Sequence, residues 1–104
     1  MIRGTTPTHI FKTSVSLVNA TKIAVTYTQG TQKVIVEKKK EDCEITPTQL
    51  SVELTQQETF EFKAFGYKAE VQITAEFMEG DKPKVLKSNI IEVDVSRSLK
   101  REII

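Results

Sequence analysis

The strongest constraint on the fold is a regular alternation of apolar and polar residues in several short segments. Residues 22–29 place Ile23, Val25 and Tyr27 on one face and polar or small residues on the other. Residues 70–78 repeat the pattern, with apolar positions at Val71, Ile73, Ala75 and Phe77. A period of two over about eight residues indicates a strand with one buried face and one solvated face.

Further short strands are expected at residues 9–12, 33–39, 42–45, 50–54, 60–63 and 85–95. The chain offers no amphipathic helix of about 10–15 residues between these segments, which excludes a parallel α/β architecture. The spacing of strands and turns predicts an all-β fold, an immunoglobulin-like antiparallel β-sandwich of about seven to eight strands. A small β-barrel is the structural alternative.

Three local patterns make finer predictions. Thr55 and Glu58 fit a capping box, which predicts a single turn of helix used as a corner. The strand expected after it would carry Phe60 and Phe62 on one face. Asn89 and Ile90 interrupt the alternation of the last strand, which predicts a bulge or bend there. In residues 33–39, Val34 and Val36 are expected to face one way and Ile35 the other.

The length of 104 residues predicts one sandwich domain spanning residues 1–104, with residues 97–104 as a short C-terminal tail. Fifteen Lys and Arg face 14 Asp and Glu, which argues against a basic nucleic-acid clamp, so no nucleic-acid partner is expected. Cys43 is the only cysteine and can form no internal disulfide. With neither a signal-peptide pattern nor a membrane-spanning stretch, we expect synthesis in a cytoplasm and no membrane contact.

The sequence offers little for catalysis. His9, the only histidine, is expected to be a solvated edge residue near the start of the first strand. Cys43 lies between Asp42 and Glu44, whose carboxylates would raise the thiol pKa, so a structural cysteine is expected. Most other carboxylates occupy the outward phase of a strand, and no glycine-rich phosphate loop is present. We therefore expect no catalytic, cofactor-binding or metal-ligating residue, no cofactor and no enzymatic activity.

A small set of residues could form contact surfaces. Phe65 and Tyr67, on either side of a glycine, are the best candidates for an exposed aromatic pair. Lysines 38–40 could contact a partner, although flanking carboxylates cancel much of their field and lysines also blunt strand edges. The apolar tail residues could dock on the same sandwich or on a neighbouring subunit as an added strand. The candidate contact residues are Lys38, Lys39, Lys40, Phe65, Tyr67, Leu99, Ile103 and Ile104.

Three segments together carry a family resemblance: residues 1–11 (MIRGTTPTHIF), residues 22–27 (KIAVTY) followed by Asp42-Cys43, and residues 52–60 (VELTQQETF). The chain resembles short all-β proteins encoded in the structural-gene region of phages and prophages of Gram-positive bacteria, from Met1 to about Val95. The resemblance implies a non-enzymatic virion component of the tail, baseplate or decoration. Its partners would be other phage structural proteins or further copies of itself, and its location would be the virion. The lysines at 38–40 depart from what the group leads us to expect.

A different function class remains open at this stage. The domain could be a small carbohydrate- or peptide-binding module that recognises its ligand through loops at one end of the sandwich. The candidate loops are residues 29–32, 38–42 and 64–67. Exposed aromatic residues would favour this alternative, because sugars and peptides commonly stack on them.

Overall fold

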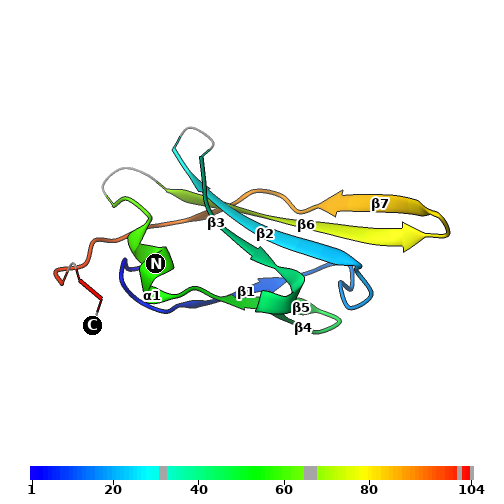
Figure 1. The fold of residues 1–104 in the computed structure, drawn as a ribbon, viewed down its shortest axis with the longest axis horizontal. Coiled ribbons are helices and arrows are strands. Elements are labelled where there is room, and N and C mark those ends of the chain that lie inside the picture. Colours follow the sequence, from blue (N-terminus) through cyan, green and yellow to red (C-terminus); the bar gives the residue numbers. More distant parts are fainter. Residues whose placement is uncertain (31–32, 65–67, 101, 104) are drawn as a thin grey trace.

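The described residues, 1–30, 33–64, 68–100 and 102–103, form two antiparallel sheets in a computed structural model of the chain (Figure 1). The strands are β1 (Thr8–Lys12), β2 (Lys22–Gln29), β3 (Lys33–Lys39), β4 (Cys43–Ile45), β5 (Gln49–Glu53), β6 (Ala69–Glu79), β7 (Lys82–Lys87) and β8 (Ile91–Val93). Two short helices join them, a 3₁₀ turn η1 (Lys40–Asp42) and α1 (Gln56–Phe60). Within these ranges the sheets do not close on themselves, so the predicted sandwich is confirmed and the barrel alternative is wrong.

The strand order is that of an immunoglobulin domain without its first strand. One sheet has the order β1-β5-β4, which corresponds to strands B, E and D. The other has the order β3-β2-β6-β7, with β8 also paired to β6, which corresponds to C′, C, F and G. Strand A would lie beside β1, but in the described part of the chain β1 pairs with β5 alone. The N-terminal residues instead place Ile2 in a parallel bridge with Ser96.

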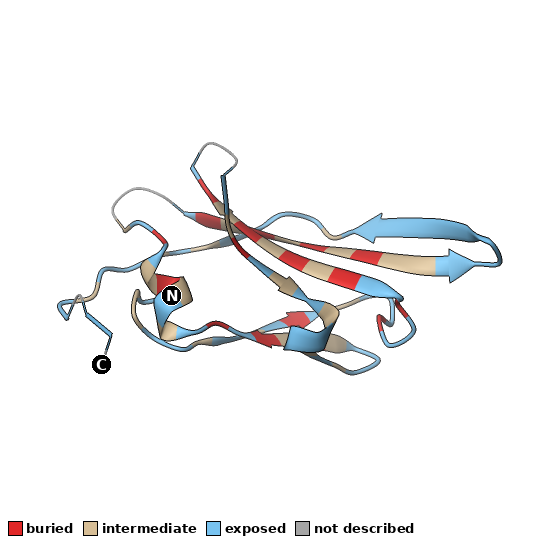
Figure 2. Cartoon of the chain, in the orientation of Figure 1, coloured by how far each residue is buried: buried red, intermediate tan, exposed pale blue. Residues whose placement is uncertain are grey.

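The hydrophobic core lies between the two sheets, where the alternating residues of both inner faces meet. The β2–β6 ladder runs from the pair Lys22–Glu76 to the pair Gln29–Ala69 and supplies the centre of the larger sheet. Figure 2 shows buried and half-buried positions alternating along β2 and much of β6, as the sequence pattern predicts. The largest fully buried side chains are Tyr27, Phe62, Leu50, Leu54, Val25, Val52, Val71 and Thr59.

Helix α1 corrects one local prediction. Thr55 accepts a hydrogen bond from the Glu58 amide, and the Glu58 carboxylate accepts one from the Thr55 amide, so the predicted capping box and helical turn are confirmed. The helix continues to Phe60, where a strand was expected, and Phe62 is fully buried beyond its end. Two aromatic residues at spacing two therefore mark a corner that packs into the core, and the strand prediction is wrong.

Strand irregularities account for two further outcomes. The β2–β3 register shifts between Tyr27 and Thr28. Ile35 is therefore an extra residue of β3 with no partner in the ladder, which is a β-bulge. Val36 is consequently buried while Val34 is exposed, so the prediction that they share a face is wrong. The predicted interruption of the last strand is confirmed, because β7 and β8 are separate strands that pair with successive parts of β6.

The far end of β6 and the part of β7 that pairs with it project beyond the core as a two-stranded arm. All six residues of β7 are exposed, and exposure along β6 rises after Ala75 (Figure 2). The arm contributes to the elongated shape of the molecule, which measures 51 × 27 × 19 Å along its principal axes. One end of the larger sheet thus extends past the smaller sheet.

The N-terminal segment is fastened to the corner around α1. The Gly4 amide donates to the Thr59 hydroxyl at 2.9 Å, and that hydroxyl lies 2.9 Å from the Thr5 carbonyl oxygen. Arg3 donates to the Phe60 carbonyl at 2.9 Å and stacks its guanidinium over the Phe60 ring. Gly4 has a φ of 79°, and its Cα lies so close to the Phe60 ring that a side chain would overlap the ring. The contact therefore requires glycine.

Gly4→Ala is expected to lower the free energy of unfolding by about 2–4 kcal/mol, because alanine is strained at positive φ and its methyl group collides with Phe60. Gly80→Ala is the matched control, since Gly80 also has positive φ but open space around it, and should cost only about 1–2 kcal/mol. Urea denaturation of both variants measures the difference. Equal losses would show that the ring contact contributes nothing.

Candidate interaction surfaces

The three consecutive lysines are held by partners within the chain. The Lys38 ammonium lies 2.7 Å from the Glu58 carboxylate, and Lys39 lies 3.2 Å from Glu37. Lys40 donates to the Ala20 carbonyl oxygen at 2.6 Å. These contacts give each ammonium an intramolecular role, and contact between this trio and a partner stays a prediction.

The Lys38–Glu58 pair is the best-enclosed ion pair among the described residues. Burial alone would raise the pKa of Glu58, but hydrogen bonds from Lys38 and from Thr55 outweigh it and hold that pKa below its usual value. The pair connects strand β3 to the first turn of α1. Lys38 therefore helps to position the corner helix.

The remaining sequence candidates lie at the ends of the described chain or outside it. Phe65, Tyr67 and Ile104 are outside the described residues. Leu99 is 89% exposed and Ile103 is also exposed, so the sandwich of the same chain covers neither side chain. Docking of the tail on a neighbouring subunit stays a prediction.

The three candidate recognition loops do not share one end of the sandwich. Residue 30 and residue 64 are on the side where β2 ends and β6 begins, and Gln29 contacts Lys63 there. Residues 38–42 lie at the opposite end, where β2 begins and Lys40 reaches Ala20 (Figure 1). The prediction of one three-loop surface is wrong, because β3 pairs with β2 from Gln29 back to Ala24 and carries the residues that follow it to the far end.

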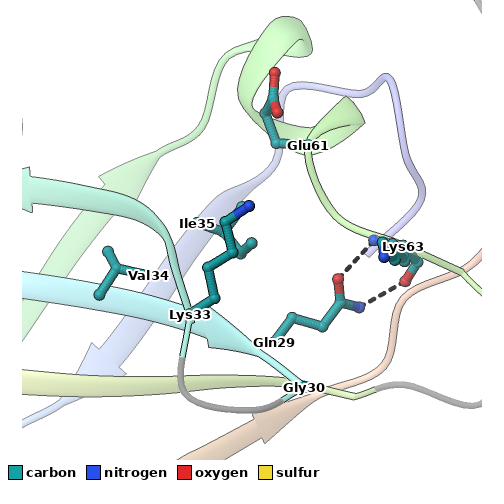
Figure 3. Close-up of a pocket in the computed structure, with 7 residues that line it drawn as sticks. All are labelled: Gln29, Gly30, Lys33, Val34, Ile35, Glu61 and Lys63. Atoms are coloured by element: carbon teal, nitrogen blue, oxygen red, sulfur yellow. Dashed lines mark hydrogen bonds between the residues drawn. The ribbon is translucent and has the colours of Figure 1, made fainter.

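A cavity of about 360 Å³ opens at the first of these ends (Figure 3). The Gln29 amide forms its floor, donating to the Lys63 carbonyl oxygen and accepting from the Lys63 amide, both at 2.6 Å. This is the pairing that a neighbouring strand would provide, so Gln29 ties the end of β2 to the segment after α1. Lys33 and Glu61 also line the cavity. The hydrogen bonds of the buried Gln29 amide therefore stabilise the fold.

His9 occupies a different environment from the one predicted. It shares the inward phase of β1 with Phe11, is half-buried, and places Nδ1 2.6 Å from the Tyr27 hydroxyl. Burial raises the pKa of Tyr27, so the hydroxyl keeps its proton and shares a hydrogen bond with the imidazole of His9. Burial, and secondarily the N-terminal positive charge, lower the pKa of His9. The expectation of a solvated edge residue is wrong, and the spacing of two from Phe11 was the signal for an inward position.

Cys43 has the setting that the sequence indicates. Its side chain is half-buried and its thiol donates to the Lys39 carbonyl oxygen at 3.3 Å. Burial raises the pKa of the thiol, and the Asp42 carboxylate raises it further. A protonated thiol with a backbone acceptor is a structural group rather than an activated nucleophile.

Sequence reasoning missed the exposed apolar residues of β7, of β8 and of the connection between these strands. Val85 is 52% exposed and Ile90 is 59% exposed, and both line the outer face of the larger sheet. Leu86 and Ile91 are each 37% exposed and point to the other face, toward the smaller sheet. Adjacent apolar pairs at 85–86 and 90–91 were the available signal, because neighbouring strand residues point to opposite faces.

No group of three His, Cys, Asp or Glu in the described ranges is arranged to hold a metal ion. None of the described helices is long and apolar enough to cross a membrane. In comparisons with known proteins, no family model, curated protein or solved structure matches the chain.

The His9 environment predicts a pH dependence of stability. Because the folded state lowers the pKa of His9 below 6.5, the unfolded chain binds more protons between the two values. The free energy of unfolding should hold above about pH 6.5 and fall as the pH decreases through the lowered pKa. Urea denaturation between about pH 7.5 and 5 measures this, in a range where most carboxylates stay ionised.

His9→Gln provides the control, because glutamine cannot titrate in that interval. Its free energy of unfolding should be nearly constant across the same range. A wild-type slope that persists unchanged in the variant would assign the dependence to other groups.

Proposed function

We propose that this protein is a non-catalytic structural and interaction protein that acts as a component of a phage or prophage particle. The observation that carries the interaction role is the arm and its continuation in β8, which leave apolar side chains uncovered on both faces of one sheet edge. Exposed apolar side chains gathered along one sheet edge commonly mark a protein–protein contact. The resemblance to phage structural-region proteins supports the particle as the setting.

The arm has the form expected of an assembly element. A two-stranded ribbon outside a core gains little stability from its own residues, so burial against a partner would stabilise it. Its edge carries Pro83 and the lysines 82, 84 and 87, which discourage uncontrolled strand pairing along β7. An exposed apolar surface next to a protected edge favours a specific contact over aggregation.

A carbohydrate- or peptide-binding module receives less support from the described side chains. Phe11, Tyr27 and Phe62 are buried, and Phe60 and Phe77 are half-buried. None of these described aromatics forms the open stacking platform that a sugar site uses. The position of residues 38–42 at the opposite end from residues 30 and 64 also weakens a shared recognition surface.

Particle composition tests the proposed function. After prophage induction in the bacterium whose genome encodes the chain, purified particles should contain the protein in a fixed ratio to the major capsid protein. Quantitative mass spectrometry of gradient-purified particles measures that ratio. Recovery of an expressed protein only from the soluble fraction, with none on particles, would contradict the proposal.

The tail makes a separate prediction. Deletion of residues 98–104 should lower the solution mass of any assembled form, because Leu99 and Ile103 would be lost from the contact with a neighbour. The melting temperature should stay within about 2 °C, because these exposed side chains contribute little to the core. Light scattering after size exclusion at two concentrations and thermal unfolding measure both quantities. Unchanged mass and unchanged melting temperature would remove the tail from the assembly contact.

A further inference from the structure

Strand β1 presents an unpaired backbone edge. Its ladder with β5 continues into hydrogen bonds from the Leu54 amide to Pro7 and from the Thr13 amide to Thr48. In an antiparallel pair, hydrogen-bonded positions alternate with positions whose amides and carbonyls point away from the partner. The backbone groups of Thr8, Ile10 and Lys12 therefore point outward. Ile10, at the middle of this edge, is 60% exposed.

An apolar groove of about 500 Å³ lies beside the same edge. Its lining includes Phe11 from β1, Val15 and Leu17 from the loop after it, and Ile73, Leu86 and Ile91 from the sheet opposite. The larger sheet thus extends one strand position past β1, and the groove lies beneath the overhang. This is the position that strand A would fill in an immunoglobulin domain.

We propose that an extended segment of a partner protein adds to β1 as the missing strand of the smaller sheet. The backbone of that segment pairs with Thr8, Ile10 and Lys12, and its alternate side chains enter the groove. This inference rests on the proposed function, since it gives the interaction protein a docking site. Two independent features support it: the free hydrogen-bonding edge and the apolar groove beside it.

The charges at the groove define the chemistry of the added strand. Lys12 and Lys87 are the charged residues that line it. The Lys87 ammonium lies 3.4 Å from the Thr74 hydroxyl on the outer face of the larger sheet. Lys84, on the same face of β7 as Leu86, lies 3.8 Å from the Glu79 carboxylate. Lys12 is therefore the cation next to which an added strand would lie. Lys12 belongs to the outward phase of β1, so it would lie next to the outward side chains of an added strand. The complementary segment has apolar residues at alternate positions and carboxylates between them.

The tail and the β1 strand of a second copy fit the groove less well. The tail carries Arg97, Lys100 and Arg101 against Glu102, and this excess of positive charge would be repelled by Lys12. Pairing of β1 with β1 of a second copy would place the two overhanging β7–β8 edges in the same space. A partner strand of acidic and apolar character is therefore the occupant to which the geometry points.

A peptide of the stated chemistry tests the proposal on the full-length protein. The probe is a fluorescent, capped peptide with the sequence of residues 89–96 (NIIEVDVS), which alternates apolar residues with two carboxylates. Fluorescence anisotropy should show saturable binding below about 1 mM that weakens as salt rises. The same peptide with Glu92→Lys and Asp94→Lys should bind at least about tenfold more weakly.

Paired variants of the protein locate the binding. Leu86→Glu puts a charge into the groove and should weaken peptide binding at least about tenfold, whereas Val85→Glu puts it on the opposite face and should not. Ile10→Pro removes an outward amide without touching the ladder to β5, and should abolish binding. Ile10→Ala keeps that amide and should retain most of the affinity. Thermal unfolding verifies that each variant folds.

Each outcome decides the inference. Peptide binding that is lost in Leu86→Glu and Ile10→Pro, and kept in Val85→Glu and Ile10→Ala, supports the proposed docking site. No binding, or binding unaffected by Leu86→Glu and Ile10→Pro, overturns it, even if the protein is found on particles. Oligomers of the full chain that these two variants dissociate would place a second copy in the groove and also overturn it. Peptide binding by a protein absent from particles would overturn the proposed function alone.

Discussion

The ladder between β2 and β6 holds the larger sheet together, because β3 attaches only to β2 and both β7 and β8 attach to β6. Its inner face places Val25 and Tyr27 beside Ile73 and Val71, all of them buried against the smaller sheet. The core therefore depends on the match between these two strands. Strand β6 is eleven residues long, while β1 and β5 have five each, so its far end has nothing beneath it.

The two sheets differ in length and in width, and this difference explains both the arm and the groove beside β1. The far end of β6 extends past the smaller sheet and pairs with β7 to form the arm. The larger sheet is also one strand wider, so Leu86 and Ile91 face an unfilled position beside β1. The N-terminal residues do not fill it, because Ile2 bridges to Ser96 and Gly4 packs against Phe60.

The sequence predicted the fold better than the surfaces. Alternation is a local property, so the strands around Ile23 and Val71 and the sandwich class could be inferred from it. The Ile35 bulge and the corner at Phe62 could not, because each depends on which strand or sheet lies opposite. His9 was assigned by its nearness to the terminus, although its phase with Phe11 indicated the interior.

Contact surfaces were harder still, because they depend on what remains uncovered after folding. The charge of lysines 38–40 is visible in the sequence, but Glu58 and the Ala20 carbonyl become their partners only when distant segments meet. The groove likewise combines β1 with β6, β7 and β8. No spacing within one segment indicates that a strand position between them is empty.

The central claim is that the position beside β1 is open in the isolated protein. Amide hydrogen exchange along β1, followed residue by residue by NMR, tests it most directly. The account predicts slow exchange at His9, Phe11 and Thr13, whose amides bond to the β5 side, and fast exchange at Ile10 and Lys12. Slow exchange at Ile10 and Lys12 in the isolated protein would show that the edge is already covered, and would contradict the account.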